Sequence, residues 1–136
     1  MHRITFLIIS LIIMSCSKDH EETADVTLEG NWRLIEELQD PGDGSAVYEP
    51  VQSSKTIQFK TDGTVTTNTS LCDPLTDEII SNGTFTKSDS EIITNCENPY
   101  ASVILFKLEG EHLILQFLVD KQFEAKLFYQ KFEKID

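Results

Sequence analysis

Short segments in which hydrophobic and polar residues alternate cover most of the chain from residue 28 onward. In the first of them, Trp32 and Leu34 alternate with the polar residues Asn31 and Arg33. A period of two places such side chains on opposite faces of a β-strand. The segments with a strand-like pattern are, in chain order, 28–35, 56–60, 64–69, 79–87, 91–94, 102–108, 112–119 and 123–132. None of them has a helical period, so the pattern predicts an all-β fold.

Turn residues join these segments into hairpins. Asp62 and Gly63 separate two of them, and an Asp-Gly pair between two β runs is a strong hairpin signal. Gly110, and later Asp120 with Lys121, are the predicted turns between the last three segments, which indicates an antiparallel meander. Sequential hairpins favour a small antiparallel up-and-down β-barrel of about 8 strands, whose closure leaves no exposed sheet edge.

The connections between other segments are less regular. Residues 39–54 are rich in proline and glycine and predict a long loop with one short strand near residues 47–48. Gly83 indicates either a bulge within its strand or a turn that precedes the strand. Residues 70–77 and 95–100 are predicted loops, because each combines a proline with polar residues.

The N-terminal region has a different pattern, a continuous apolar run that follows His2 and Arg3. The run spans residues 4–14, and at about 11 residues it is well short of the ~20 that a transmembrane helix needs. Its length and its charged start are typical of a secretory signal peptide. We therefore expect residues 1–15 to be a signal peptide that directs export.

The end of this run resembles the bacterial lipobox. Ile13, Ser15 and Cys16 supply its aliphatic, small and cysteine positions, with Met14 between them. The resemblance implies cleavage before Cys16 and attachment of lipid, palmitate included, to the Cys16 side chain, so that the membrane is a partner through this lipid. The alternative is a cysteine that stands at the end of a signal peptide by chance.

Residues 16–27 are polar and acidic and have no apolar period, so we expect them to form a flexible tether. The start of this tether, residues 17–22, resembles the acidic export signal that sends Bacteroidota lipoproteins to the outer face of the outer membrane. The resemblance implies a lipid-anchored outer-membrane protein that is exposed at the cell surface. An orientation toward the periplasm is the alternative.

Acidic residues outnumber basic ones along the chain. The sequence has 11 Lys and Arg against 23 Asp and Glu, a formal net charge of −12. A surface of this sign repels phosphate backbones, which excludes nucleic acid as an expected partner. The charge serves solubility or, alternatively, attracts a cationic partner. The length fits one domain, residues 28–136, after the signal peptide and the tether.

Two cysteines remain in the domain, Cys72 and Cys96. An even number of cysteines in an exported protein predicts a disulfide between them. The bridge would close a loop of about 25 residues, which the chain-entropy model values at about 3.5 kcal/mol. Two buried free thiols or a metal-binding pair are the alternatives, although the absence of a second Cys or His near either residue disfavours zinc.

Four sequence motifs occur in the order found in the lipocalin-like domain lipoproteins of Bacteroidota. They are Leu28-x-Gly30-x-Trp32-x-Leu34, then Ile57-x-Phe59-x-x-Asp62-Gly63-Thr64, then Gly83-Thr84-Phe85, and finally Leu113-x-Leu115. The chain resembles this family over most of residues 28–132, and its Gly-x-Trp is similar to the mark of the lipocalin superfamily. The last strands contain no arginine of the kind that lipocalins pack across this tryptophan, but they contain Lys126 and Lys131.

Trp32 has a physical role that does not depend on this resemblance. An indole at the closed end of a small barrel fills a large volume and plugs that end. We therefore expect Trp32 to be a core residue and the opposite end of the barrel to be the open one.

Catalytic and metal-binding patterns are absent from the sequence. His112 is the one histidine of the domain and stands beside Glu111 at the start of a strand, so a base for a nucleophile is missing. The acidic group Asp73, Asp77 and Glu78 does not have the spacing of a calcium loop and is expected to be solvated. We therefore predict neither an enzyme nor a cofactor or metal site.

Apolar binding is the chemistry that remains. The last three segments carry more apolar and aromatic residues than edge strands need, and these either fill the barrel or line a cup: Phe106, Leu108, Leu113, Leu115, Phe117, Phe123, Leu127, Tyr129 and Phe132. We expect a non-enzymatic barrel that binds a small apolar or amphipathic ligand at the end away from Trp32. The alternative is a solid barrel that docks an envelope protein through its acidic face or through loops 39–54 and 70–78.

Overall fold

The computed structural model describes residues 26–40, 43–75, 79, 81–97, 102–121 and 124–136. The predicted signal peptide, the lipid-bearing Cys16 and the tether up to residue 25 lie outside the described residues, as does Phe123. Among the described residues there is no helix of the length and hydropathy that crossing a membrane requires. The strands of the described part are β1 (Gly30–Asp40), β2 (Glu49–Pro50), β3 (Thr56–Phe59), β4 (Thr64–Thr67), β5 (Asn82–Lys87), β6 (Glu91–Thr94), β7 (Val103–Glu109), β8 (His112–Lys121) and β9 (Glu124–Ile135).

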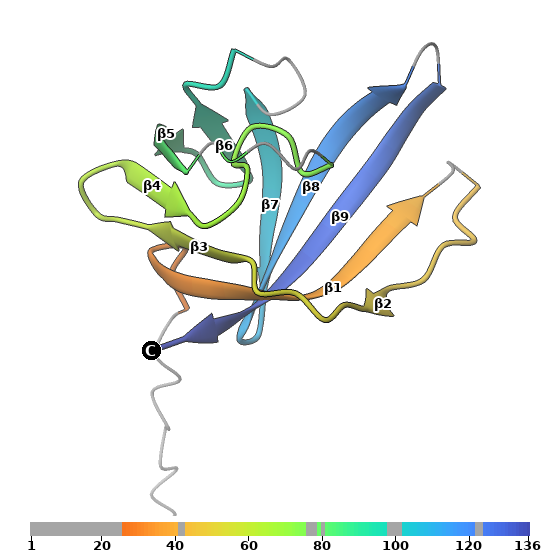
Figure 1. Cartoon of the computed structure of the whole chain (residues 1–136), viewed down its shortest axis with the longest axis horizontal. Coiled ribbons are helices and arrows are strands. Elements are labelled where there is room, and N and C mark those ends of the chain that lie inside the picture. Colours follow the sequence, from red (N-terminus) through yellow and green to blue (C-terminus); the bar gives the residue numbers. More distant parts are fainter. Residues whose placement is uncertain (1–25, 41–42, 76–78, 80, 98–101, 122–123) are drawn as a thin grey trace, which may run out of the picture.

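These strands form one antiparallel sheet that closes on itself (Figure 1). Each strand from β3 to β9 pairs with the next in the chain, and β1 pairs with both β3 and β9. The short β2 pairs with the second half of β1, at Glu36 and Glu37. The eight strands other than β2 are therefore a closed up-and-down barrel, which confirms the predicted fold class.

The two ends of the barrel differ in their connections. The turns at Gly63 and Gly110, both with positive φ, lie at one end, which also holds the start of β1 and the end of β9 (Figure 1). The opposite end holds the long connections β1–β2, β4–β5 and β6–β7. We call the first the closed end and the second the open end.

Three predicted boundaries are wrong. The short strand expected near residues 47–48 lies at Glu49–Pro50, because Glu49 is the residue that meets the free edge of β1. Asp120 and Lys121 do not form a turn, since the β8–β9 ladder continues through them to Ala125 and Glu124. The first strand extends to Asp40 because β9 pairs with it over that length.

Gly83 is neither in a bulge nor in a turn. It lies within β5 and pairs with Val65 in regular register. A Cβ atom at this position would lie 2.7 Å from Leu71 Cδ2 and 2.9 Å from Asn95 Oδ1. The glycine is therefore explained by the close approach of two neighbouring loops and not by its backbone conformation.

A bulge in β1 changes which residues face the barrel interior. The β1–β9 register shifts between Leu34 and Glu36, so Leu34 is opposite Phe132 and Glu37 is opposite Gln130. Residues directly opposite each other in an antiparallel pair lie on the same face of the sheet. Because the partners on β9 are buried, the inward positions of β1 change from even numbers near Trp32 to odd numbers beyond the bulge.

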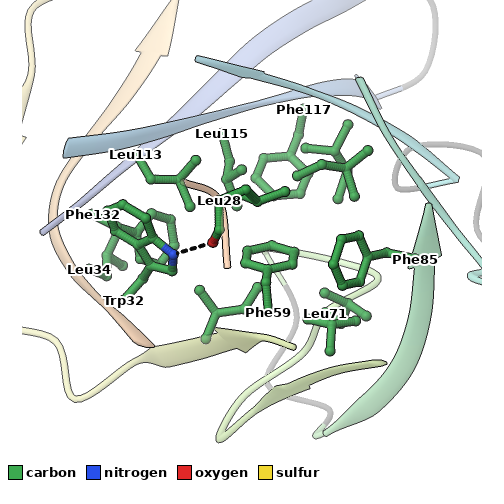
Figure 2. Packing of buried hydrophobic residues seen from close by; sticks show 14 of the residues in the cluster. Leu28, Trp32, Leu34, Phe59, Leu71, Phe85, Leu113, Leu115, Phe117 and Phe132 are labelled. Carbon is green, nitrogen blue, oxygen red and sulfur yellow. Dashed lines mark hydrogen bonds between the residues drawn. The ribbon is translucent and has the colours of Figure 1, made fainter. Parts of the chain in front are cut away.

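The core lies between the barrel walls (Figure 2). Alternate residues of nearly every strand contribute to it, and Leu28 and Leu71 enter from the flanking loops. Its buried hydrophobic residues are Leu28, Trp32, Leu34, Ile57, Phe59, Val65, Leu71, Phe85, Ile92, Cys96, Ile104, Leu113, Leu115, Phe117, Phe128 and Phe132. Phe59 and Phe85 meet edge to face, with ring centroids 5.1 Å apart.

Candidate functional site

Trp32 occupies the closed end of the barrel. None of its surface is exposed (0%), and Phe132 and Leu113 are buried beside it (Figure 2). Its Nε1 donates a hydrogen bond of 2.8 Å to the backbone oxygen of Leu28. A buried indole needs such a partner, because its N–H would otherwise lose its bond to water. Trp32 thus fills this end and presents no surface to a ligand.

A lysine covers the ring of Trp32. Lys134 Nζ lies 5.3 Å from the centroid of the ring, within the range of a cation–π contact. The two lysines noted in the sequence are elsewhere: Lys131 pairs with Glu36 at 2.7 Å, and the side chain of Lys126 is outside the described part. The residue that covers the tryptophan is therefore Lys134, which the sequence analysis did not single out.

Gly30 is required by its backbone conformation. Its φ is 137°, a conformation that side chains with a Cβ rarely adopt. A Cβ atom here would also lie 2.9 Å from Cε of Lys134. The Gly-x-Trp motif is thus explained by one local structure, in which the lysine stem packs over the glycine and its ammonium lies over the indole.

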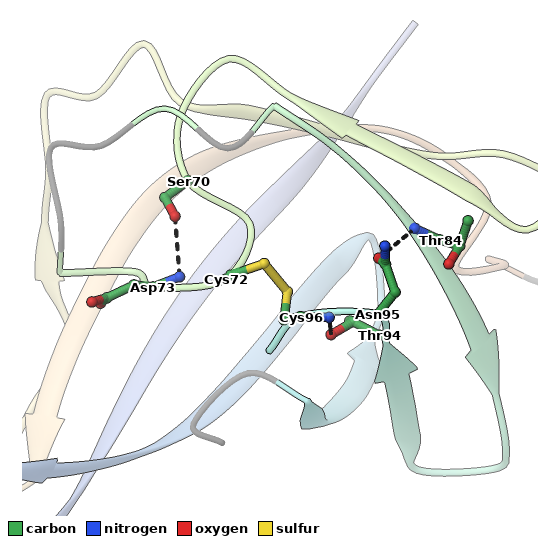
Figure 3. Close-up of a disulfide and its surroundings, with 7 residues drawn as sticks. All are labelled: Ser70, Cys72, Asp73, Thr84, Thr94, Asn95 and Cys96. Carbon is green, nitrogen blue, oxygen red and sulfur yellow. Dashed lines mark hydrogen bonds between the residues drawn. A yellow bond between two sulfur atoms is a disulfide. The ribbon is translucent and has the colours of Figure 1, made fainter. Parts of the chain in front are cut away.

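The disulfide between Cys72 and Cys96 is present, which confirms that prediction (Figure 3). The two Cα atoms are 5.4 Å apart. Cys72 belongs to the β4–β5 loop, and Cys96 follows β6. Asp73 N donates to Ser70 Oγ at 3.1 Å, which fixes the loop beside the bridge. The bridge therefore joins two long connections at the open end.

Three polar side chains lie inside the barrel above the apolar core. Lys55 is 8% exposed and Gln130 is 1% exposed. Lys55 Nζ donates to Gln130 Oε1 at 2.9 Å, and Gln130 Nε2 donates to Glu37 Oε1 at 2.8 Å. We call Lys55, Gln130 and Glu37 the interior polar cluster. It runs from the side of the barrel near β3 across β9 to the second half of β1.

Burial makes the ammonium of Lys55 costly. Desolvation lowers its pKa from the ordinary value to about 8, and the charge of Glu37 offsets this only in part. An ammonium has three donors, and among the described residues only Gln130 accepts from it. Replacing a buried charged group by an apolar residue of similar size is often neutral or stabilising, so the burial of Lys55 does not by itself indicate a gain in stability.

A pocket of about 450 Å³ opens beside the cluster. Glu37 and Gln39 on β1, Val51, and Phe128 on β9 form its inner part. Ser45, Ala46 and Val47 of the β1–β2 loop also line it. We call this the mouth pocket, and its described lining residues are Glu37, Leu38, Gln39, Ser45, Ala46, Val47, Glu49, Val51 and Phe128. It lies beyond the bulge of β1 and therefore toward the open end.

A second hollow, of about 470 Å³, lies on the outer face of the barrel. Tyr129 meets Tyr48 there edge to face, with ring centroids 6.5 Å apart. Lys131 Nζ lies 5.6 Å from the centroid of the Tyr48 ring. We call it the outer groove, and its described lining residues are Tyr48, Ser90, Leu105, Phe106, Lys107, Glu109, Ile114, Gln116 and Tyr129.

The apolar residues singled out in the last three strands separate into two groups. Leu113, Leu115, Phe117 and Phe132 are buried, and Phe106 and Leu108 pack against them. Tyr129 is different, because it faces the outer groove and so neither fills the interior nor lines a cup. Successive side chains of a strand point to opposite faces, so Tyr129, which stands between the inward residues Phe128 and Gln130, points outward.

Other polar residues singled out in the sequence do not assemble into a site. His112 is half-buried at the closed end, where it lines a hollow of about 370 Å³ with Glu111 and Glu133. Asp73 Oδ1 accepts from Leu75 N at 2.9 Å as part of its own loop. Asp77 and Glu78 lie outside the described residues. No three metal-binding side chains come together in the part of the chain that the structure describes.

Sequence reasoning missed the interior polar cluster, although a signal for it exists. Lys55 lies two residues before Ile57 and four before Phe59, so it shares their inward face. Gln130 likewise lies between the inward residues Phe128 and Phe132. A polar residue at an inward position of an otherwise apolar strand face is the informative exception. Glu37 gave no such signal, because only the bulge turns it inward.

The chain matches a model of the lipocalin-like domain over residues 28–115. No curated protein matches it. The matched region covers more than half of the 136-residue chain and contains the Gly-x-Trp motif, the Asp-Gly hairpin and the disulfide. The closed antiparallel barrel agrees with this match, and the protein belongs to the lipocalin-like domain family.

Proposed function

We propose that this protein is a lipid-anchored binding protein of the bacterial cell envelope, of the Bacteroidota type. Its barrel takes a small apolar or amphipathic ligand into the mouth pocket and catalyses no reaction. The lipobox-like segment at Cys16 supports the anchor, and the acidic start of the tether supports display on the outer face of the outer membrane.

The mouth pocket is the observation that carries the binding proposal. Its volume of about 450 Å³ lies within the range of small-molecule sites, roughly 300–1,000 Å³. Val51 and Phe128 provide apolar surface, and Glu37 and Gln39 provide polar groups beside it. The described lining combines four polar residues with five apolar ones, a mixture that suits a ligand with a polar head and an apolar tail.

Native mass spectrometry of the protein purified from its source tests binding. We expect a bound mass of a few hundred daltons, on the scale of a pocket of this volume. The variant Ala46→Trp should lose that mass, because the indole occupies the pocket. Ile79→Trp, which adds the same bulk at an exposed position outside the pocket, should retain it. The proposal would be contradicted if the purified protein carried no small molecule, or if both variants retained the bound molecule equally.

The anchor has a separate test. Replacing Cys16→Ala should abolish incorporation of labelled palmitate and leave the signal peptide uncleaved or wrongly cleaved. Equal labelling of the variant and the natural chain would show that lipid is attached elsewhere.

The outer groove favours a second function, docking of an envelope protein. Leu105 lines the outer groove and is exposed. Ile93, Val103 and Leu118, on β6, β7 and β8, are also exposed but lie outside the groove lining. Ile93 and Val103 are direct cross-strand partners, so they form one continuous apolar surface. A photo-crosslinker at position 105 in intact cells should capture a protein if this function holds. Recovery of lipids alone would argue against it.

A further inference from the structure

The charged groups that line the mouth pocket have a single sign. Glu37 and Glu49 are its charged residues among the described lining, which contains no lysine or arginine. The apolar wall formed by Val51 and Phe128 lies beside them. Charge complementarity between a pocket and its ligand favours binding and discriminates against a head group of the same sign.

The interior polar cluster holds the Glu37 carboxylate in place. Gln130 donates to Oε1 of Glu37 at 2.8 Å, and Lys55 fixes the amide of Gln130 from behind at 2.9 Å. Among the described residues no donor reaches Oε2 of Glu37. One carboxylate oxygen is thus oriented by the protein, and the other is available to a ligand in the pocket.

Lys55 does not reverse the negative sign of the pocket. It does not contribute to the described lining, and only 8% of it is exposed, so a ligand head in the pocket meets carboxylates first. The chain as a whole has a formal net charge of −12. This long-range field also raises the local concentration of cations and lowers that of anions.

We propose that the mouth pocket binds a cationic amphiphile, a molecule with an ammonium head and a short apolar tail. The head lies between the carboxylates of Glu37 and Glu49, and the tail lies against Val51 and Phe128. This inference rests on the proposed binding function and adds the chemical class of the ligand. Glu37 is the residue that determines selectivity, because it is the oriented and less exposed carboxylate of the two.

Three probes with the same tail and different heads test the proposal: octyltrimethylammonium, octanol and octanoate. Each is titrated by calorimetry into the full chain held in nanodiscs of zwitterionic phosphatidylcholine, and empty nanodiscs correct for partitioning into lipid. We expect octyltrimethylammonium to bind at least about tenfold more tightly than octanoate, a difference of about 1.4 kcal/mol. Octanol should lie between the two.

Two variants assign the selectivity to the pocket. Glu37→Gln removes the charge but keeps an oxygen that can accept from Gln130, so the fold should be retained, as circular dichroism can verify. It should weaken octyltrimethylammonium about tenfold and leave octanol unchanged. Glu111→Gln, the matched control at the closed end of the barrel, should change neither affinity.

The outcomes separate this inference from the function on which it rests. If all three probes bind equally and Glu37→Gln changes nothing, the head-group assignment is wrong and the binding function stands. If octanoate binds most tightly and Lys55→Met abolishes its binding, the pocket selects anions and the inference is overturned. If no probe binds at all, the binding function of this pocket fails as well.

Discussion

Each end of the barrel contains a lysine, and the two lysines differ in their exposure to water. At the closed end Lys134 lies at the surface over the ring of Trp32, so its charge stays solvated while its stem packs on Gly30. At the open end Lys55 is buried and has lost most of its water. A lysine at the closed end adds stability at little cost, whereas the lysine at the open end costs stability.

The connections differ in the same way. The closed end is made of tight turns such as that at Gly63, where Asp62 Oδ1 accepts from Thr64 N at 2.9 Å. The open end holds the long connections β1–β2, β4–β5 and β6–β7, and a disulfide joins the last two of them. Long connections leave room for a pocket, but their closure costs more conformational entropy than that of tight turns.

Truncation of the tryptophan should have the largest effect on the closed end. Trp32→Ala removes a fully buried indole and leaves a cavity, for which we expect a loss of about 4 kcal/mol in the free energy of unfolding. Urea denaturation of the variant and the natural chain measures the loss. A loss below about 1 kcal/mol would show that the closed end is not packed around this residue.

Removal of the disulfide should have the next largest effect and should act on the open end. The double variant Cys72→Ser/Cys96→Ser is expected to lose about 3.5 kcal/mol, because the bridge restrains a loop of about 25 residues in the unfolded chain. Melting under oxidising and reducing conditions measures it. The natural chain should melt lower after reduction, and the variant should not change. An identical melting point of the natural chain in both conditions would contradict the prediction.

The buried lysine gives a pH-dependent prediction. The folded state binds the Lys55 proton with a pKa of about 8, whereas the unfolded chain binds it with the higher ordinary value. Below pH 8 both states are protonated and the cost of burial is fully present. Between pH 8 and the ordinary lysine pKa the folded state has lost its proton first, so its stability rises with pH.

Comparison of Lys55→Met with the natural chain isolates this effect from other titrating groups. The stability of the variant minus that of the natural chain should decrease by about 3 kcal/mol between pH 7 and pH 10.5. The unsatisfied amide of Gln130 in the variant adds a cost that does not change with pH. The same difference in free energy of unfolding at both pH values would show that Lys55 is solvated.

The smallest effect is expected for the surface lysine. Lys134→Met should lower the free energy of unfolding by about 0.5–1 kcal/mol, the usual range of an exposed cation–π contact. Lys134→Arg should retain the stability, because a guanidinium over an indole makes the same contact. If the methionine variant were as stable as the natural chain, the Lys134 ammonium would contribute nothing to stability and only the packing of its aliphatic stem would count.

Much of the fold could be predicted from local patterns. The Asp62-Gly63 turn and the strands on either side of it have the expected positions, because a hairpin depends on residues close in sequence. The short β2 was misplaced by two residues, since its position depends on where the free edge of β1 becomes available. The turn predicted at Asp120 and Lys121 was also wrong, because β8 continues to pair with β9 through these two polar residues.

The candidate site could be predicted only in part. Cys72 and Cys96 were paired correctly from their number and from the expected compartment. The interior polar cluster was missed, because its three members are distant in the chain: Lys55 and Gln130 are 75 residues apart, and Gln130 and Glu37 are 93 apart. No local pattern joins residues at such separations.

By itself the sequence determined the all-β class, the order of hairpins and the place of Trp32 in the core, because alternation and turn chemistry act over a few residues. Only the tertiary structure decided that Lys134 covers the tryptophan and that a bulge turns Glu37 inward toward Gln130. Both depend on the register between β1 and β9, the first and last strands of the barrel. Closure of the barrel sets that register, and with it the side chains that meet at each end.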